Sequence, residues 1–91
     1  MMSAAPSSTG VVVYTMDYCP FCDRAKRLLK MRGIAFEEIH VDADDDAHWD
    51  ELYEKSGMRT MPQIWARGTL VGGFTELAAQ DAADQLESLK K

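Results

Sequence analysis

The chain has 91 residues, which is enough for one small domain with a single hydrophobic core and too few for two. Its hydrophobic fraction of 46% is ordinary for a globular protein. Against 10 basic residues stand 15 acidic ones, and the net charge of −5 argues against a surface that binds nucleic acid or anionic membranes.

Residues 1–9 are small and polar, and they lack the basic start and apolar stretch of a secretory signal. No apolar segment approaches the ~20 residues that cross a bilayer. We therefore expect a disordered tail over 1–9, a single domain over 10–91, and a reducing cytoplasm as the compartment.

The first predicted strand spans Gly10 to Thr15. Its valines, Val11 to Val13, are continuous rather than alternating with polar residues, which predicts burial on both faces. An amphipathic stretch from Phe21 to Arg32 predicts a helix with Gly33 at its C-terminal end. The expected apolar face of this helix consists of Cys22, Ala25, Leu28 and Leu29.

Two cysteines, Cys19 and Cys22, stand where this strand ends and this helix begins. The first turn of a helix has unpaired N–H groups whose partial positive charge favours an anion. A thiolate is such an anion, and it is the form of cysteine that attacks disulfides. Pro20 fits the first helical position, where no N–H is needed. The placement predicts redox chemistry.

The same motif can also form half of a zinc site or a structural disulfide. A zinc site needs a second pair of ligands, but there are only two cysteines, and His40 and His48 lie outside the usual spacing. A disulfide between such close cysteines closes too small a loop to stabilise the fold much. We therefore expect no bound metal and favour the redox interpretation.

The next two elements predict a parallel pair of strands and a second helix. A strand over Phe36 to Val41 would pair in parallel with the first strand through a right-handed crossover. Asp45 or Asp46 can cap a second helix that Gly57 closes. The inward residues expected on that helix are Trp49, Leu52 and Tyr53.

The rest of the chain predicts a hairpin and a last helix, giving the order βαβαββα. Gln63–Ala66 and Thr69–Val71 flank Arg67-Gly68, a pair typical of a tight turn. The final helix is expected over Thr75 to Leu89, with a candidate interruption at Gln80-Asp81.

The acidic run 42–46 does not fit a calcium-binding loop. In that alignment Ala47 would fall at the glycine position and Tyr53 at the bidentate glutamate position. We predict a solvated loop with a helix cap instead. The other aromatic and imidazole side chains are assigned to the core (Trp49, Trp65) or to solvent without a partner (His40, His48).

Three separated motifs give the chain a specific resemblance to the glutaredoxins, over about Val11 to Leu89. They are Cys19-Pro20-Phe21-Cys22, Arg59-Thr60-Met61-Pro62 and Gly72-Gly73-Phe74-Thr75-Glu76. The resemblance implies an α/β, thioredoxin-like three-layer fold, with a four-stranded mixed sheet flanked by helices. Its active site would lie at the carboxyl end of the first strand, where open α/β sheets bind ligands.

The resemblance also implies roles for the two thiols. Cys19, at the mouth of the helix, would be the nucleophile, and Cys22, one turn in, would resolve mixed disulfides. The alternative for Cys22 is a small core residue, since much glutaredoxin chemistry needs only the first cysteine. Phe21 stands where the family often has Tyr, so the aromatic surface is kept and a hydroxyl is lost.

The second motif would bind glutathione. Thr60-Met61-Pro62 resembles the family's Thr-Val-Pro segment, whose proline is cis. The backbone N–H and C=O of Met61 would then pair with an extended glutathione as a short added strand does. Arg59 is a nearby cation. The alternative for Pro62 is an ordinary proline at the start of a strand.

The third motif would hold the glutamyl end of glutathione. Gly73, Phe74 and Thr75 lie at a helix start whose free N–H groups can bind the γ-glutamyl carboxylate. Glu76 stands where the family commonly has Asp, which meets the glutamyl ammonium. Alternatively, Glu76 is only a first-turn acid that favours the helix dipole. Met16 replaces a lysine that many glutaredoxins carry.

The resemblance therefore implies a glutathione-dependent thiol–disulfide oxidoreductase that serves electron transport and cell redox homeostasis. We expect no bound cofactor, glutathione as reductant and co-substrate, and glutathionylated or disulfide-bonded proteins as partners. We expect a monomer that binds neither nucleic acid nor membrane.

Two rivals remain. A protein reduced by thioredoxin reductase would normally show Trp-Cys-Gly-Pro-Cys and lack Gly72-Gly73. An iron–sulfur binding module would mostly have Gly or Ser where Pro20 stands.

Overall fold

The computed structural model describes residues 10–83, 85 and 86. The predicted tail over 1–9 and the far end of the last predicted helix lie outside the described residues. In chain order the elements are β1 (Val11–Thr15), α1 (Pro20–Met31), β2 (Glu37–His40), α2 (Asp46–Ser56), β3 (Gln63–Ala66), β4 (Thr69–Gly72) and α3 (Phe74–Ala82). The predicted order βαβαββα is confirmed.

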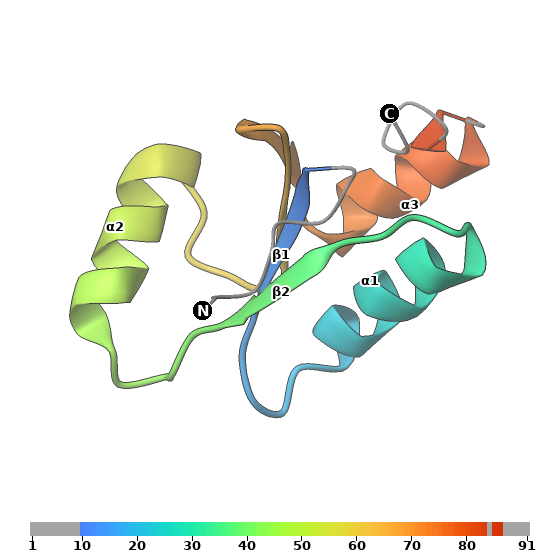
Figure 1. The fold of residues 1–91 in the computed structure, drawn as a ribbon. Helices are drawn as coiled ribbons and strands as arrows, with labels where there is room; N and C mark the ends of the chain where they lie inside the picture. Colours follow the sequence, from blue (N-terminus) through green and yellow to red (C-terminus); the bar gives the residue numbers. More distant parts are fainter. Residues whose placement is uncertain (1–9, 84, 87–91) are drawn as a thin grey trace.

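The strands form one mixed sheet in the order β2-β1-β3-β4. β1 pairs in parallel with β2 and antiparallel with β3, which pairs antiparallel with β4. Figure 1 shows the resulting layers, with α1 and α3 on one side of the sheet and α2 on the other. This is the thioredoxin-like fold that the sequence predicts.

The main core lies between the sheet and the pair α1 and α3. It consists of Val11, Val13, Ala25, Leu29, Ile34, Ile64, Ala66, Leu77 and Leu86. Leu29 of α1 and Leu77 of α3 are fully buried, and each such side chain stabilises the fold by roughly 1.5–3 kcal/mol. A smaller cluster of Cys22, Val41, Leu52 and Met61 lies around the cysteines, with Tyr14, Met16, Cys19 and Trp49 partly buried against it.

The prediction that β1 is buried on both faces is wrong. Val11, Val13 and Thr15 are buried, whereas Val12 and Tyr14 are half-buried. The cause is the unequal cover of the sheet, because two helices pack on one face and only α2 lies over the other (Figure 1).

The second helix begins and ends as predicted. The side chain of Asp45 accepts a hydrogen bond from the N–H of His48, and Gly57 adopts a left-handed conformation with φ of 73°. Leu52 is buried, but Tyr53 is exposed and Trp49 only half-buried, so the predicted inward face is too wide. Trp65, expected in the core, is also half-buried, on the face of the sheet that α2 covers.

The prediction that both histidines lack partners is wrong. Nε2 of His40 lies 3.0 Å from Oδ1 of Asp17, and its Nδ1 lies 3.5 Å from Oδ1 of Asp42. The ring of His48 meets that of Tyr14 edge-on, with ring centroids 6.0 Å apart. The contacts of His40 with Asp17 and of His48 with Tyr14 join segments far apart in the sequence.

The hairpin turn forms at the predicted pair, with φ of 51° at Arg67 and 83° at Gly68, the signs that a tight two-residue hairpin requires. The last helix ends at Ala82 and runs through the predicted interruption at Gln80-Asp81. The chain turns beyond Ala82, which lets Leu86 reach the main core, where it is buried.

Candidate active site

The N-terminus of α1 carries both cysteines. Cys19 is the N-cap residue, with an extended backbone, and Cys22 lies in the first turn. The N–H of Cys22 points at Sγ of Cys19 over 3.2 Å. Cys19 is half-buried, whereas Cys22 is only 2% exposed, so Cys19 is the thiol that a substrate can reach. The two sulfurs form a disulfide, so the structure is that of the oxidised chain.

The backbone carbonyl of Met61, in the second motif, faces the outer cysteine. Its oxygen lies 3.7 Å from Sγ of Cys19. The Met61–Pro62 peptide bond is cis, which confirms that prediction. Met61, in the segment that precedes β3, therefore lies directly opposite the sulfur of Cys19.

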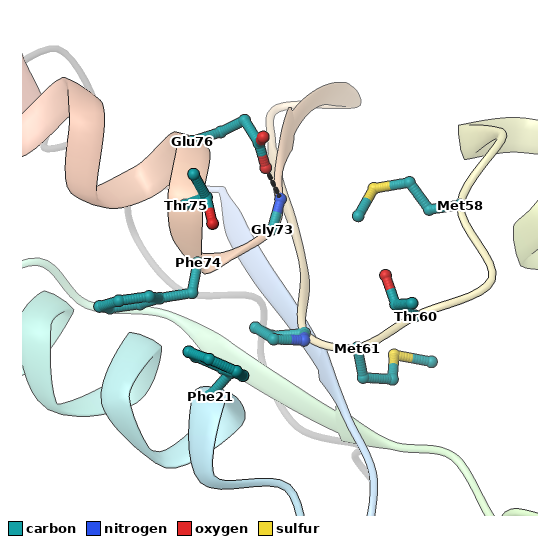
Figure 2. A pocket seen from close by; sticks show the side chains of 9 residues that line it. Phe21, Met58, Thr60, Met61, Gly73, Phe74, Thr75 and Glu76 are labelled. Carbon is teal, nitrogen blue, oxygen red and sulfur yellow. Dashed lines mark hydrogen bonds between the residues drawn. The ribbon is translucent and has the colours of Figure 1, made fainter.

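A pocket of about 410 Å³ opens beside these residues. Its walls come from the start of α1, the segment before β3 and the start of α3 (Figure 2). The lining residues are Phe21, Met58, Thr60, Met61, Pro62, Gly73, Phe74, Thr75 and Glu76. The structure thus brings together every predicted glutathione residue except Arg59, and it adds Met58, which the sequence analysis missed.

Two aromatic rings form one wall of this pocket. The rings of Phe21 and Phe74 lie next to each other, with centroids 6.0 Å apart and planes inclined by 32° (Figure 2). The guanidinium of Arg24 lies 5.3 Å from the centre of the Phe21 ring, on α1 itself. The contact between the two phenylalanines joins α1 to α3 at the mouth of the pocket.

Glu76 caps its own helix. Its Oε1 accepts a hydrogen bond of 2.6 Å from the backbone N–H of Gly73, drawn as a dashed line in Figure 2. A Cβ atom at Gly72 would lie 2.7 Å from the Glu76 side chain, and the backbone there has φ of 127°. Only glycine fits that position. Glu76 therefore caps α3, and its contact with the glutamyl ammonium of glutathione stays a prediction.

Substitutions at Glu76 can separate the two roles. We expect Glu76→Gln to keep the capping acceptor but to raise the KM for glutathione by about two- to fivefold, the range of an exposed ion pair. Glu76→Ala should also lose about 0.5–2 kcal/mol of unfolding free energy with the cap. Steady-state kinetics and urea denaturation measure the two effects. An unchanged KM in Glu76→Gln would show that Glu76 caps α3 and does not contact the glutamyl ammonium.

Arg59 lies apart from the pocket. Its guanidinium stacks 4.0 Å above the ring of Tyr53, and it lines a neighbouring groove with Asp46, Trp49 and Asp50. Tyr53, expected to face inward, is thus on the surface with Arg59 stacked on its ring. The assignment of Arg59 to glutathione stays a prediction.

Gln63 supports the segment that lines the pocket, and the sequence analysis missed it. The side chain is fully buried, and Nε2 donates to the carbonyls of Met58, over 3.2 Å, and Thr60, over 3.3 Å. Its Oε1 is buried without a partner among the described residues. A signal was available, because a polar residue in an otherwise apolar strand must find hydrogen bonds inside the protein.

A polar network holds the end of β1 below the cysteines. The Thr15 hydroxyl donates to Oε2 of Glu38 over 2.8 Å, and Nζ of Lys26 donates to the same oxygen over 3.0 Å. Burial raises the pKa of the Glu38 carboxyl, but the hydrogen bonds from Thr15 and Lys26 outweigh it and leave the pKa lowered. The network joins β1, β2 and α1.

Nearby, burial raises the pKa of the Tyr14 hydroxyl, and the charges of Glu51 and Glu37 raise it further.

Among the helices of the described residues, none has the length and apolar character to cross a membrane.

The chain is similar to known proteins in both sequence and structure. Residues 11–71 match the protein family described as Glutaredoxin. Glutaredoxin of Pseudomonas aeruginosa is 44% identical over 79 residues, covering 87% of this chain and 93% of that protein. Glutaredoxin 3 of Escherichia coli K12 is 40% identical over 81 residues, covering 89% and 96%.

Two solved structures extend the comparison. The crystal structure of a buckwheat glutaredoxin–glutathione complex superposes with a TM-score of 0.80 at 27% identity, covering 88% of this chain and 74% of that one. The solution structure of glutaredoxin from Brucella melitensis gives a TM-score of 0.78 at 40% identity, covering 89% and 87%.

Proposed function

This chain belongs to the glutaredoxin family of thiol–disulfide oxidoreductases, and on that premise we propose that it reduces glutathione mixed disulfides and protein disulfides through the Cys19 thiolate. The observation that carries the proposal is the position of Cys19. It caps α1, lies 3.7 Å from the Met61 carbonyl, and stands beside a pocket of about 410 Å³. Glutathione is the reductant and co-substrate.

The proposed reaction consists of two exchanges. The Cys19 thiolate attacks the glutathione sulfur of a mixed disulfide, which forms a Cys19–glutathione disulfide and releases the substrate thiolate to take up a proton. The thiolate of a second glutathione then attacks the glutathione sulfur bound to Cys19. Glutathione disulfide leaves, and the Cys19 thiolate returns. One free glutathione is consumed: its sulfur and the glutathione sulfur of the mixed disulfide become glutathione disulfide, and the substrate sulfur becomes a thiol.

For protein disulfides we propose that Cys22 takes part. Cys19 first forms a mixed disulfide with the protein substrate, and the Cys22 thiolate attacks Sγ of Cys19 to release the reduced protein. The product is the Cys19–Cys22 disulfide, the form present in the structure. Two glutathiones then reduce it. The depth of Cys22 below Cys19 supports this order of attack.

The start of α1 would keep Cys19 ionised. The N–H of Cys22 already points at its sulfur, and the partial positive charge of a helix N-terminus favours a thiolate by about 0.3–1 kcal/mol. The inner thiol is buried in an apolar cluster, which disfavours its charged form. The surroundings therefore favour a thiolate at Cys19 more than at Cys22, as the proposed roles require.

The pocket would hold glutathione along the segment before β3. We propose that the backbone of Met61 pairs with the tripeptide as an added strand, with Thr60 and Pro62 beside it. At the other end, the start of α3 at Gly73 to Glu76 would bind the γ-glutamyl group. The wall of Phe21 and Phe74 covers the apolar side, and Arg59 would offer a cation from the neighbouring groove.

A turnover assay on a glutathione mixed disulfide tests the proposal. Turnover is expected when the assay is coupled to glutathione and glutathione reductase, and none when it is coupled to thioredoxin reductase alone. The reverse result would place the chain with proteins that thioredoxin reductase serves. Because the reaction needs reduced glutathione, we also propose the cytoplasm as its compartment, and a monomer without a bound cofactor as its active form.

Met16 offers a test of how the site attracts glutathione. Its side chain is half-buried against the cluster that contains Cys22 and Met61. We expect Met16→Lys to lower the KM for glutathione by roughly two- to fivefold at low salt, as an added exposed ion pair would. The gain should shrink as ionic strength rises, because salt screens such pairs. Met16→Gln is the uncharged control, and equal KM values for both variants at low salt would exclude the position from the site.

A further inference from the structure

We propose that Tyr18 is a docking surface for the polypeptide that carries the substrate cysteine, and that it favours polypeptides with lysine or arginine next to that cysteine. The inference rests on the proposed function, since it names the class of protein substrate that would approach Cys19. Tyr18 has a left-handed backbone and an exposed ring, and it lies beside acidic side chains.

Tyr18 has an unusual conformation for its size. Its φ is 56°, in the left-handed region that glycine and asparagine adopt more readily than a bulky residue. Its side chain is 101% exposed, so packing against the residues that the structure describes does not offset that conformation. A strained residue directly before a nucleophile indicates a function rather than a structural role. A bare aromatic ring is also the kind of side chain that anchors protein interfaces.

The position of Tyr18 makes it available to a polypeptide and not to glutathione. It precedes Cys19 directly, and it is not among the residues that line the pocket. With the glutathione half of a mixed disulfide in that pocket, the polypeptide half must lie over the surface outside it. Tyr18 and Pro20 are the exposed residues on either side of Cys19 in the sequence, and of the two only Tyr18 carries an aromatic ring.

The charges beside Tyr18 favour a basic partner. The carboxylate of Asp17 is 75% exposed, and that of Asp42 is 73% exposed, with the ring of His40 between them. Two cations of α1 already have other contacts: Lys26 binds Glu38 over 3.0 Å, and Arg24 lies over Phe21. An ammonium or guanidinium group can therefore approach the Tyr18 ring and gain from the carboxylates, whereas an acidic segment is repelled.

The test uses two glutathionylated peptides that differ only next to the cysteine, with two lysines in one and two glutamates in the other. The mixed disulfide of glutathione and 2-mercaptoethanol serves as the small substrate. At low salt we expect kcat/KM to be about two- to fivefold higher for the lysine peptide, the range of an exposed cation–π contact. The difference should narrow as salt rises.

Three variants locate the effect. Tyr18→Gly should lower kcat/KM for the lysine peptide by about two- to fivefold and leave the small substrate unchanged, while Tyr18→Phe keeps the ring and the preference. Asp17→Asn keeps a polar partner for His40 and should reduce the preference for lysine over glutamate.

Equal rates for both peptides, or a Tyr18→Gly variant as active as wild type on the lysine peptide, would overturn the docking surface and leave the proposed function intact. Failure of the wild-type chain on the small substrate would overturn both.

Discussion

Replacing Cys19 by serine is expected to abolish reduction of glutathione mixed disulfides, whereas Cys22→Ser should keep substantial activity and accumulate glutathione on Cys19. The reason is the difference in access: Cys19 caps α1 and is half-buried, and Cys22 is almost fully covered. A serine hydroxyl at position 19 does not ionise at neutral pH and cannot form the covalent intermediate.

Steady-state turnover of a glutathione mixed disulfide measures the first effect, and intact-protein mass spectrometry without reductant detects the adduct. Reduction of a protein disulfide gives the matched comparison, because the proposed exchange there needs both thiols. Cys22→Ser should therefore fail on that substrate while it remains active on the mixed disulfide. A Cys22→Ser variant that is inactive in the first assay would show that Cys22 is the nucleophile and Cys19 the resolving thiol.

The sequence was sufficient for the fold because each element carries its own local signal. Gly57 ends α2 with a left-handed backbone, and Arg67-Gly68 makes the hairpin turn, each for a reason that holds within a few residues. The cysteine motif belongs to the same class, since helix capping at Cys19 depends only on the next turn of chain. Such features can be read without knowing which strands become neighbours.

The errors arose where the outcome depends on what packs above a residue. The run Val11 to Val13 predicts a strand buried on both faces, but α2 covers its face of the sheet incompletely and Val12 stays half-buried. Tyr53 is on the surface, where Arg59 stacks on it, a contact that no spacing rule anticipates. His40 likewise gains its partner Asp17 only once β1 and β2 lie side by side.

The candidate site follows the same division. The three motifs supplied the residues that line the pocket, but not the way Glu76 turns back to Gly73, nor Arg59's place in a separate groove. The apolar strand around Gln63 signals a buried polar side chain, but the sequence does not show which backbone carbonyls that side chain contacts.

Gln63 therefore carries the second large prediction. We expect Gln63→Met, which matches the side chain in length but has no donor, to lose about 1–3 kcal/mol of unfolding free energy as the carbonyls of Met58 and Thr60 lose their partner. The segment they belong to lines the pocket, so the KM for glutathione should rise several-fold. Removal of the unpaired Oε1 offsets part of the loss in stability and none of the rise in KM.

Gln63→Glu distinguishes positioning from general loosening through its pH dependence. An ionised carboxylate would face two carbonyl oxygens, whereas a protonated one can donate to one of them, so burial and these oxygens raise the pKa of the introduced acid. The stability of Gln63→Glu relative to wild type should be highest below about pH 4.3, the pKa of glutamate in the unfolded chain, and fall as pH rises towards the pKa in the folded chain.

The KM of Gln63→Glu for glutathione, divided by the KM of wild type at the same pH, should also fall towards one as pH is lowered. Gln63→Met has no such group and should show a constant ratio. Identical pH profiles for the two variants, or a normal KM in Gln63→Met despite its lower stability, would show that the buried amide only fills space and does not set the shape of the pocket.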